Sequence, residues 1–501
     1  MQFRYFKMVA IAILGIVAMT SCKKFLNINK DPDRIPADNA PVAQLLTSAQ
    51  MNLAFEGGSD LFRYATLMAQ QMSGQASQPN QTYEYDRYNI TGSDENNVWG
   101  SIFATTLSDL EIIIKQASVL NAPNFSGVAK ILKAYEYSLV VDTWGDVPYS
   151  DAQQLDANTA PHYDDDATIY PKLITLLTDA VTEINATTGT MSPGTTSIMY
   201  PGSWSSKKAN WIKLANTLRL RLLLHYSKKD PAFAVAQLTA LINSGTFMAS
   251  NADNFQMVFN DAANQRNPIT QFETSRPNYL FANATMVNLM NAKSDPRRVA
   301  YFTPFPWGST SYKGVTPGDP PTIDYSRIYT FLRGAATGTP VPNANGGITA
   351  ASLTFSGAAP IRMVTFTEYN FIRAEAALMG APGDPQAIFT AGTPASMQEA
   401  GVSAANITTY LAANGTLTGT NAQKLQQIIE EKYVALFGVS VEPWTDWRRT
   451  GYPLLTPVSN RISQVTNIPR SFFYAQSEID LNPNCPGQKP ADLQSKIFWD
   501  N

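Results

Sequence analysis

Amphipathic helical segments recur along most of this 501-residue chain, and they limit it to a mainly helical fold. Apolar residues repeat there with a period of 3.6, which places them on one face of a helix. This pattern occurs in Ile169 to Ile184, Val128 to Asp142, Trp211 to Tyr226 and Leu425 to Gly438. Each segment therefore predicts a helix that buries one face against a neighbour.

Two further helices form a predicted hairpin. Phe371 to Met379 is rich in alanine, which lets two helices approach closely, and it ends at a Gly-Ala-Pro-Gly turn before a second helix over Ala387 to Ala400. A helix, a turn and a second helix in about 34 residues is the scale of a tetratricopeptide unit, although the full repeat consensus is absent.

Between about residues 245 and 360 the sequence changes, and Pro, Gly, Asn and Tyr dominate. Each proline removes a backbone donor and fixes φ, so segments such as Tyr301 to Gly308 and Thr316 to Pro321 cannot be regular helix. We predict long ordered loops with a short hairpin at most. Loops carried by a rigid scaffold are where recognition usually occurs.

Composition excludes several classes of protein. The net charge is −3, whereas nucleic-acid binding needs a basic surface. Only two histidines (His162 and His225) and two cysteines (Cys22 and Cys485) are present, which excludes most metal sites that depend on them, and we predict no cofactor and no metal. The chain lacks the common hydrolase, zinc-protease and nucleotide-binding motifs. We interpret His225 as a packed helix residue and His162 as a solvated turn residue, so no enzyme is predicted.

Asp164-Asp165-Asp166 precede the segment that begins at Ile169 and allow two interpretations. They could bind calcium, or they could cap the helix and place acidic charge at its start. The sequence favours the cap, because acidic side chains stabilise a helix N-terminus.

The N-terminus is typical of an export signal. Arg4 and Lys7 precede an uncharged apolar run from Met8 to Met19, which is shorter than the ~20 residues that a membrane span needs. The sequence from Ala18 to Cys22 resembles a bacterial lipobox, and an ordinary secretory signal with an incidental cysteine is the alternative. We predict a lipoprotein signal peptide over 1–21, lipidation of Cys22 with palmitate among its acyl chains, a tether over 22–39 and one domain over 40–501.

Four further segments stand out in the sequence. They are Asp142–Tyr149 with the sequence Gly-Asp-Val-Pro-Tyr, Phe366–Ala376, Ile429–Gly438 followed by Glu442–Pro453, and Ile468–Tyr474 followed by Glu478 and Asn482. Together they resemble the SusD/RagB family of Bacteroidetes surface lipoproteins, which bind glycans or peptides for nutrient uptake. The aromatic residues Trp144, Trp444, Trp447 and Tyr433 are interpreted as locks between helices. Arg448 and Arg449 are predicted to pair with Glu430, Glu431 or Asp446.

The resemblance implies a mainly α fold, with a tetratricopeptide-like hairpin scaffold packed against a loop-rich ligand-binding region with little β structure. It implies a non-catalytic outer-membrane lipoprotein, facing the cell exterior, that delivers oligosaccharides to a SusC-like TonB-dependent transporter. Capture of oligopeptides is the alternative, in which Arg297, Arg298 and Arg327 would bind carboxylates. Lys23-Lys24-Phe25 depart from the acidic residues that often follow the cysteine of surface-exported members.

The ligand site is predicted from residue types, because sugar rings need aromatic platforms beside polar side chains. We expect Trp307, Tyr312, Tyr83 and Tyr85 to supply stacking faces, and Arg87 and Asn97 to bind hydroxyl or carboxylate groups. In the alternative, Tyr83, Tyr85 and Tyr88 form one face of a strand or pack on the body.

Overall fold

The computed structural model describes residues 40–74, 81–154, 157–189, 191–319 and 325–500. The chain divides into two compact units, Met1–Pro41 and Val42–Asn501, and the elements below belong to the second unit. The predicted signal peptide, the tether and Cys22 lie outside the described residues. Of the helices in the part that the structure describes, none combines the length and the apolar character that a bilayer crossing requires.

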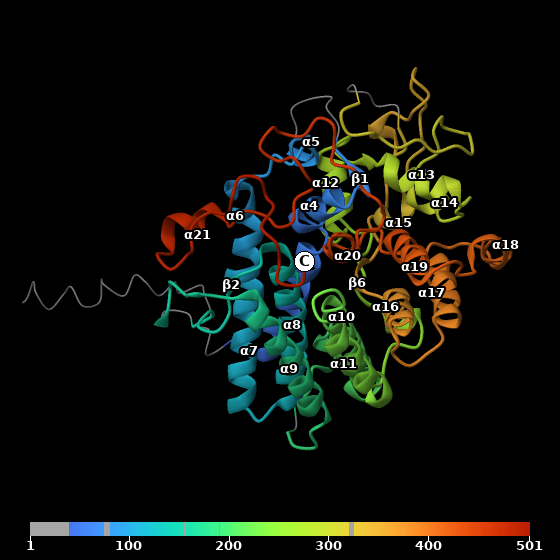
Figure 1. Cartoon of the computed structure of the whole chain (residues 1–501). Helices are drawn as coiled ribbons and strands as arrows, with labels where there is room; N and C mark the ends of the chain where they lie inside the picture. Colours follow the sequence, from blue (N-terminus) through green and yellow to red (C-terminus); the bar gives the residue numbers. More distant parts are fainter. Residues whose placement is uncertain (1–39, 75–80, 155–156, 190, 320–324, 501) are drawn as a thin grey trace, which may run out of the picture. The chain divides into compact units, whose positions relative to one another are not determined.

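Long helices that pack side by side form the first part of this unit (Figure 1). α7 contacts α8, α8 contacts α9, α9 contacts α10 and α10 contacts α11. The bounds are α3 Val42–Glu56, α4 Asp60–Met68, α5 Gln81–Asp86, α6 Gly92–Gly100, the π-helix η2 Ser101–Thr106, α7 Leu107–Val119, α8 Pro123–Trp144, α9 Asp166–Asn185, α10 Trp204–His225 and α11 Pro231–Ser244. The helices predicted from periodicity in this part, α8, α9 and α10, are confirmed.

The ends of α8 follow from its sequence. Pro123 stands in the first turn, where its fixed φ suits the helix and its missing N–H is no loss. Gly145 follows the last helical residue with a φ of 74°, a conformation that glycine adopts without strain. The chain then turns into the short strand β2.

The predicted hairpin is also confirmed. α16 (Phe366–Met379) and α17 (Pro385–Glu399) pack against each other, and α16 ends at Gly380 in the left-handed conformation. Gly392 of α17 lies so close to Asn370 that an added Cβ would come within 2.9 Å of the Asn370 Cβ. The small residues therefore allow the close helix contact. The later helices are α18 Ala404–Asn414, α19 Asn421–Ala435, α20 Glu442–Thr450 and α21 Gln476–Leu481.

Residues 245–360 form the predicted loop-rich part, and its described residues contain only short elements. These are the 3-10 helices η5 Asn251–Asp253 and η6 Ala350–Ser352, the helices α12 Pro268–Ser275, α13 Ala284–Ala292, α14 Arg298–Tyr301 and α15 Thr330–Arg333, and the strands β4 Phe255–Met257 and β5 Phe281–Ala282. The connection between α9 and α10 includes the 3-10 helix η4 Gly194–Thr196.

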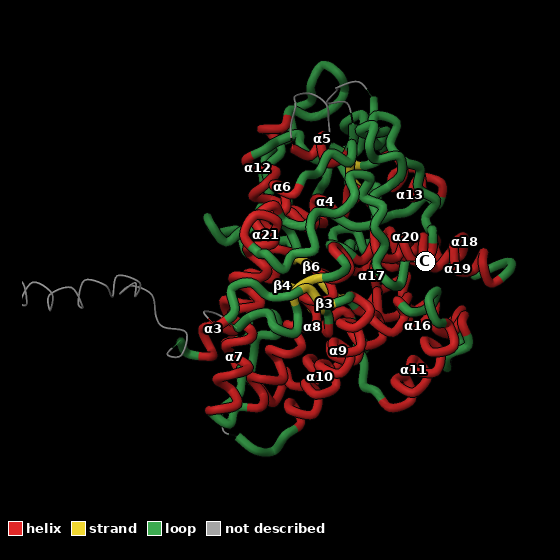
Figure 2. Tube along the Cα trace, turned by 60° about the vertical axis from the view of Figure 1, so that its left-hand side comes forward, coloured by secondary structure: helices red, strands yellow, loops and turns green. Residues whose placement is uncertain are grey.

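Strand is confined to short antiparallel pairs in the described residues (Figure 2). β1 (Met72–Ser73) pairs with β5, β2 (Val147–Pro148) pairs with β3 (Tyr163–Asp164), and β4 pairs with β6 (Ile361–Val364). The predicted fold class, a helical hairpin scaffold with a loop-rich part and little β structure, is confirmed.

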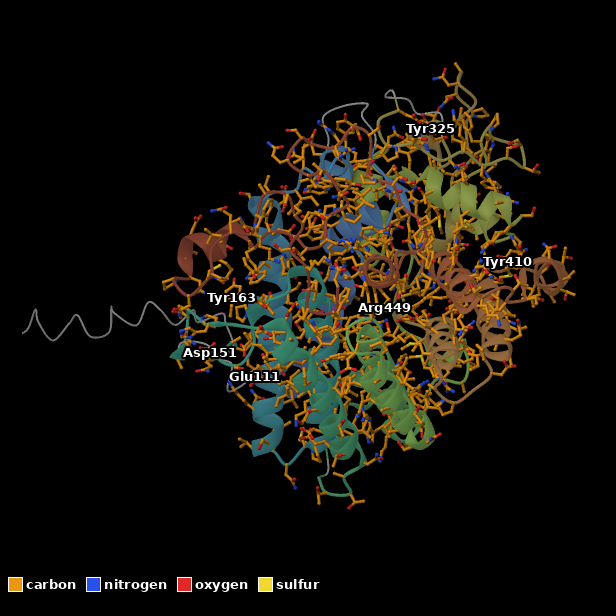
Figure 3. All side chains as sticks on the ribbon, in the orientation of Figure 1. Glu111, Asp151, Tyr163, Tyr325, Tyr410 and Arg449 are labelled. Carbon is orange, nitrogen blue, oxygen red and sulfur yellow. The ribbon has the colours of Figure 1, made fainter. Side chains whose placement is uncertain are left out.

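Buried ion pairs hold the scaffold helices together. The guanidinium of Arg449 on α20 binds the carboxylates of Glu375 and Asp446, and Figure 3 shows Arg449 among the packed helices. Lys432 Nζ of α19 lies 3.0 Å from Glu442 Oε1 and 2.7 Å from Asp446 Oδ2. Buried ion pairs of this kind fix the relative positions of the helices that carry them.

A second group of ion pairs shows the same pattern. Arg221 Nη2 of α10 lies 2.6 Å from Glu368 Oε2 of α16. Arg297 of the loop-rich part binds Asp295 and Glu431, and Tyr410 of α18 donates to Glu431 over 2.8 Å. The Arg221 pair thus joins α10 to α16, and the Arg297 pairs tie the loop-rich part to α18 and α19.

The predicted roles of the family segments are correct in part. Trp144, Trp444 and Tyr433 are buried, as expected for residues that lock helices. Arg449 pairs with Asp446, as predicted. The prediction for Arg448 is wrong, because its guanidinium lies 3.7 Å above the Trp444 ring and donates to the carbonyl of Arg470.

Candidate functional site

Trp307 lies in the loop after α14 and retains part of its exposed surface. Its backbone N–H donates to the carbonyl of Gly346 over 2.8 Å, and its half-buried indole packs on the small apolar cluster of Ile348, Leu353 and Phe355. Tyr329 packs on the same cluster, edge-on to Phe355 with ring centroids 5.8 Å apart. We call these five residues the Trp307 cluster. The packing holds the Trp307 indole in place and leaves part of it accessible, which suits stacking on a sugar ring.

Tyr312 occupies a separate position from Trp307. Its half-buried ring packs on the main core, and the Arg298 guanidinium lies 5.3 Å from the ring centroid. Burial raises the pKa of the Tyr312 hydroxyl. Trp307 and Tyr312, the two predicted stacking residues of the loop-rich part, therefore pack on different apolar clusters.

The prediction for Tyr85 as a stacking face is wrong. Residues 81–86 form helix α5, and the Tyr85 ring is 1% exposed because it packs edge-on against Tyr64 at 4.8 Å. Its hydroxyl donates to Asp94 Oδ1 over 3.0 Å. Tyr88 is buried as well, so the alternative that these tyrosines pack on the body is correct for both.

Tyr83 and Arg87 remain at the surface of the same region. Both are half-buried, and the Arg87 guanidinium lies 5.4 Å from the Tyr83 ring centroid. Arg87 Nε donates to the carbonyl of Asn460 over 2.9 Å, and its Nη1 lies 3.5 Å from Glu84 Oε1. Arg87 thus fixes a loop near residue 460 and has fewer donors left for a ligand than predicted.

Asn97 is exposed on α6, as a ligand-binding amide requires. Its neighbour Asn96 accepts a hydrogen bond from the Ser477 backbone over 2.9 Å, which connects α6 to α21. The structure records no shared cluster that brings Asn97 to Trp307 within the described residues.

A pocket of about 380 Å³ opens where the loop-rich part meets β6 and the end of α17, and no sequence pattern pointed to it. Its walls are small or apolar, and its polar groups include Arg362, Glu399, Thr330 and Ser356. Arg362 stacks on Phe331 at 3.8 Å, and its Nε lies 3.9 Å from Glu399 Oε1. The lining residues are Ala300, Thr330, Phe331, Gly334, Ala335, Ser356, Ala358, Ala359, Pro360, Arg362, Glu399, Ala400 and Gly401.

The pocket and the Trp307 cluster adjoin along the chain. Tyr329 and Phe355 belong to the cluster, while the next residues, Thr330 and Ser356, line the pocket. An aromatic face and a mainly apolar pocket with a few polar groups are both features that suit a carbohydrate chain. Arg362 and Glu399 are 37 positions apart, on a strand and a helix end, so sequence spacing could not have paired them.

Buried arginines elsewhere in the loop-rich part lie over aromatic rings. The Arg333 guanidinium is 3.9 Å from the Phe355 ring centroid and the Arg327 guanidinium is 5.3 Å from that of Phe281. Burial lowers the pKa of Arg333 to about 10, although the charge of Glu273 opposes the shift. Burial also raises the pKa of Glu273 to about 7, against the effect of the two arginines.

The carboxylate-binding role proposed for Arg297 in the oligopeptide alternative is wrong. Its guanidinium is fully buried and already binds Asp295, Glu431 and Ser396. Arg298 is half-buried and donates to Asn291 Oδ1 over 2.7 Å.

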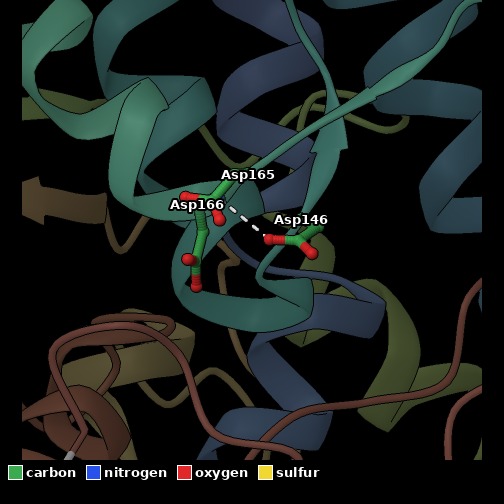
Figure 4. A group of neighbouring side chains, drawn as sticks. All are labelled: Asp146, Asp165 and Asp166. Carbon is green, nitrogen blue, oxygen red and sulfur yellow. Dashed lines mark hydrogen bonds between the residues drawn. The ribbon is translucent and has the colours of Figure 1, made fainter.

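The acidic residues at the start of α9 form a group with Asp146 (Figure 4). Asp146, Asp165 and Asp166 each offer an oxygen within 4.8 Å of the others, and Asp146 Oδ1 accepts from the Asp166 backbone over 2.9 Å. Asp165 is at the N-cap position but makes no capping bond with its side chain. The capping prediction is thus correct for position and for acidic charge, and wrong for the side-chain bond.

Burial, together with the charges of Asp146 and Asp165, raises the pKa of Asp166 to about 6. Burial lowers the pKa of the Lys489 amine to about 7, against the effect of Asp146 and Asp166. Asp166 Oδ2 also accepts a hydrogen bond from the Phe498 backbone N–H over 2.9 Å.

The two histidines occupy the predicted environments. His225 is buried, with its Nδ1 2.7 Å from the Tyr170 hydroxyl, and its Nε2 lies 3.5 Å from Glu442 Oε1. His162 is exposed and its Nδ1 lies 3.0 Å from Asp151 Oδ2. His225 belongs to the buried network of the scaffold, and His162 to a surface turn.

Comparison with known proteins agrees with this architecture. Among solved structures, a chitin-binding protein aligns with a TM-score of 0.73 at 25% identity, covering 92% of this chain and 100% of its own. A chitin-binding SusD homolog from Flavobacterium johnsoniae aligns with a TM-score of 0.74 at 23% identity, over 92% of this chain and 98% of that one. A SusD homolog from Bacteroides fragilis aligns with a TM-score of 0.74 at 22% identity, over 91% of this chain and 99% of that one. No curated protein sequence matches the chain.

The family model described as "Starch-binding associating with outer membrane" matches residues 34–475, which is most of the chain. Proteins of this family bind ligands and are not catalysts, in agreement with the prediction that the chain is not an enzyme. The chain belongs to the SusD-like family of glycan-binding proteins that associate with the outer membrane.

Proposed function

We propose that this protein is a lipid-anchored receptor on the outer face of the outer membrane that captures nutrient oligosaccharides and delivers them to a SusC-like TonB-dependent transporter. Family membership supports the glycan class and the membrane association. The single structural observation that carries the proposal is the Trp307 cluster, which adjoins a polar pocket on the loop-rich part.

In this proposal Trp307 is the principal stacking face, and Tyr312 and Tyr83 are further contacts. Each of the three rings is half-buried, so each is held by the protein and keeps an accessible part. Asn97, which is exposed, and Arg87 would bind hydroxyl groups at the edge. Tyr85 is left out because its ring is buried.

The oligopeptide alternative has less support. It relied on three arginines, of which Arg297 is occupied by two carboxylates and Arg327 is buried over Phe281. Only Arg298 keeps an accessible part, and its guanidinium lies over Tyr312. One partly accessible cation is a poor basis for recognising peptide carboxylates.

The transporter partnership can be tested by affinity purification of the tagged, full-length lipoprotein from native outer membranes in mild detergent. We expect a stoichiometric TonB-dependent barrel, identified by mass spectrometry, together with any retained oligosaccharide. Elution of the lipoprotein alone, under conditions that keep other membrane complexes intact, would contradict the delivery role.

The anchor can be tested separately. The Cys22→Ser variant should lose incorporation of radiolabelled palmitate and leave the outer-membrane fraction, because two acyl chains are needed for a stable membrane anchor. A Cys485→Ser variant is the matched control and should remain anchored, since it changes the other cysteine of the chain. Continued labelling of the Cys22→Ser variant would contradict the proposed site.

A further inference from the structure

The pocket between β6 and the end of α17 has the features of a built binding site. Arg362 and Glu399 have side chains that are only 9% and 8% exposed, yet both line an open depression. Arg362 Nε has no hydrogen-bond partner among the described residues, and Glu399 Oε1 lies 3.9 Å from it, beyond hydrogen-bond distance. This Nε is itself shielded from solvent, as are those of Arg448 and Arg449, so it indicates loose pairing of Arg362 with Glu399 and not a donor that faces the depression.

The positions of both side chains are fixed by other contacts. The Arg362 guanidinium lies on the Phe331 ring, and its Nη1 donates to the Phe331 carbonyl over 3.3 Å. Glu399 accepts a hydrogen bond from the side chain of Asn254. Each residue is thus held in place at the wall of the pocket.

The charge of the pocket limits what it can bind. Arg362 and Glu399 together have no net charge, so an anion would meet the repulsion of Glu399 and a cation that of Arg362. Neighbouring hydroxyl groups are both donors and acceptors, and can therefore satisfy a carboxylate and a guanidinium at the same time. The other walls offer methyl groups, such as those of Ala335, Ala358 and Ala400, to an apolar sugar face.

The size of the pocket is consistent with one sugar residue. Its volume of about 380 Å³ is at the lower end of the range for small-molecule sites, roughly 300–1,000 Å³. Two members of the Trp307 cluster, Tyr329 and Phe355, directly precede pocket residues in the chain, and the cluster would stack on further residues of the same glycan.

We propose that this pocket is a specificity subsite that holds one uncharged sugar residue, with Arg362 and Glu399 as its hydroxyl-binding groups. This inference rests on the proposed glycan-binding function and adds the chemical class of the ligand. It accounts for a buried, loosely paired arginine and glutamate at an open surface.

The test uses an array of oligosaccharides that are neutral, uronate-bearing, sulfated or rich in free amines, including maltohexaose, N-acetylchitohexaose and deacetylated chitohexaose. The full mature protein is applied as wild type and as the variants Ala358→Leu, Glu399→Gln and Trp307→Ala. Ala358→Leu fills the pocket, while Glu399→Gln removes its negative charge and keeps an oxygen for Asn254. Ala404→Leu, the same change at an exposed position of α18, is the matched control.

We expect the wild type to bind neutral glycans, Ala358→Leu to lower the affinity at least tenfold, and Ala404→Leu to leave it unchanged. Glu399→Gln should weaken binding of neutral glycans and increase the relative binding of uronate-bearing ones by about tenfold, because the pocket then has a net positive charge. A purely structural role of Glu399 would not change the preference in this way. The melting temperature of each variant shows that it is folded.

Three results would overturn the inference. If Trp307→Ala loses binding while Ala358→Leu and Glu399→Gln bind like the wild type, the subsite is wrong and the proposed function stands. A wild type that prefers charged glycans would contradict the ligand class. If the wild type binds none of the glycans, both the subsite and the proposed glycan-binding function are contradicted.

Discussion

The helical scaffold and the loop-rich part both bury cationic side chains, but the pKa values of these side chains shift in opposite directions. In the scaffold, burial would lower the pKa of Arg221, Arg449 and Lys432, but nearby carboxylates outweigh it and raise all three. In the loop-rich part and the adjoining strand β6, burial dominates and lowers the pKa of Arg327, Arg333 and Arg362.

Three arginines depart from this contrast. Arg219 of the scaffold helix α10 donates to Asn216 Oδ1, and burial lowers its pKa. Arg297 belongs to the loop-rich part but is fully paired, because it ties that part to Glu431 of the scaffold. Arg448 belongs to the scaffold, yet it lies over Trp444 and Trp499 and burial lowers its pKa to about 10. Close pairing with carboxylates therefore occurs where a cationic side chain joins two elements. At the pocket, Arg362 is only loosely paired with Glu399, over 3.9 Å.

The largest effect should come from breaking a scaffold pair. Arg449→Ala leaves the buried carboxylates of Glu375 and Asp446 without their partner, and should lower the free energy of unfolding by about 3–5 kcal/mol. Urea unfolding measures this. A loss below about 1 kcal/mol would show that the network does not hold the helices together.

The stability of the loop-rich part should depend on pH through Glu273. The pKa of Glu273 is raised to about 7 in the folded protein, from an ordinary value of 4.5, so the native state binds the proton more tightly. Between pH 4.5 and 7 the folded state therefore holds more protons than the unfolded state, and stability falls as the pH rises.

The variant Glu273→Gln removes this group and isolates its contribution. The stability of the wild type relative to Glu273→Gln should decrease between pH 4.5 and 7, by up to about 3 kcal/mol. Parallel unfolding titrations at several pH values measure the difference. A constant difference across this range would mean that Arg327 and Arg333 keep Glu273 ionised.

Removal of the aromatic platform should affect binding and leave the fold intact. Trp307→Ala should reduce glycan affinity about tenfold, since stacking on an aromatic ring contributes roughly 0.5–1.5 kcal/mol beyond area burial. Calorimetry with the best glycan of the array measures the loss. The reverse pattern, with unchanged affinity and a much lower melting temperature, would assign Trp307 to packing.

The smallest effect should come from an exposed cation of the loop-rich part. Arg276→Ala removes a guanidinium that lies 5.3 Å from the Phe272 ring centroid at the surface, and should change stability by less than about 1 kcal/mol. It is the matched control for Arg449→Ala. If Arg276→Ala lowered the free energy of unfolding as much as Arg449→Ala, the proposed difference between scaffold and loop-rich cations would be contradicted.

The helical scaffold could be predicted from the sequence because its signals are local. Apolar periodicity located α8, α9, α10 and α19, and the alanine-rich segment with its Gly-Pro turn located α16 and α17. The prolines and glycines between residues 245 and 360 located the loops.

The site was less predictable because it depends on tertiary packing. Tyr83 and Tyr85 have similar sequence surroundings, yet helix α5 buries one ring and leaves the other half-exposed. Arg362 and Glu399 meet only because β6 and the end of α17 are brought together, and residue types alone do not show that. Arg449 was paired correctly with Asp446, three residues away on one helix, while its partner Glu375 lies in a distant segment.

The most direct test of the account is hydrogen–deuterium exchange of the wild type with and without the glycan that binds most tightly on the array. If the loop-rich part binds the ligand, we expect slower exchange on binding in residues 300–312, 329–362 and 399–401. Exchange in α7 to α11 should be unchanged. Protection confined to the scaffold helices, with none around Trp307 or the pocket, would contradict the claim that the loop-rich part binds the ligand.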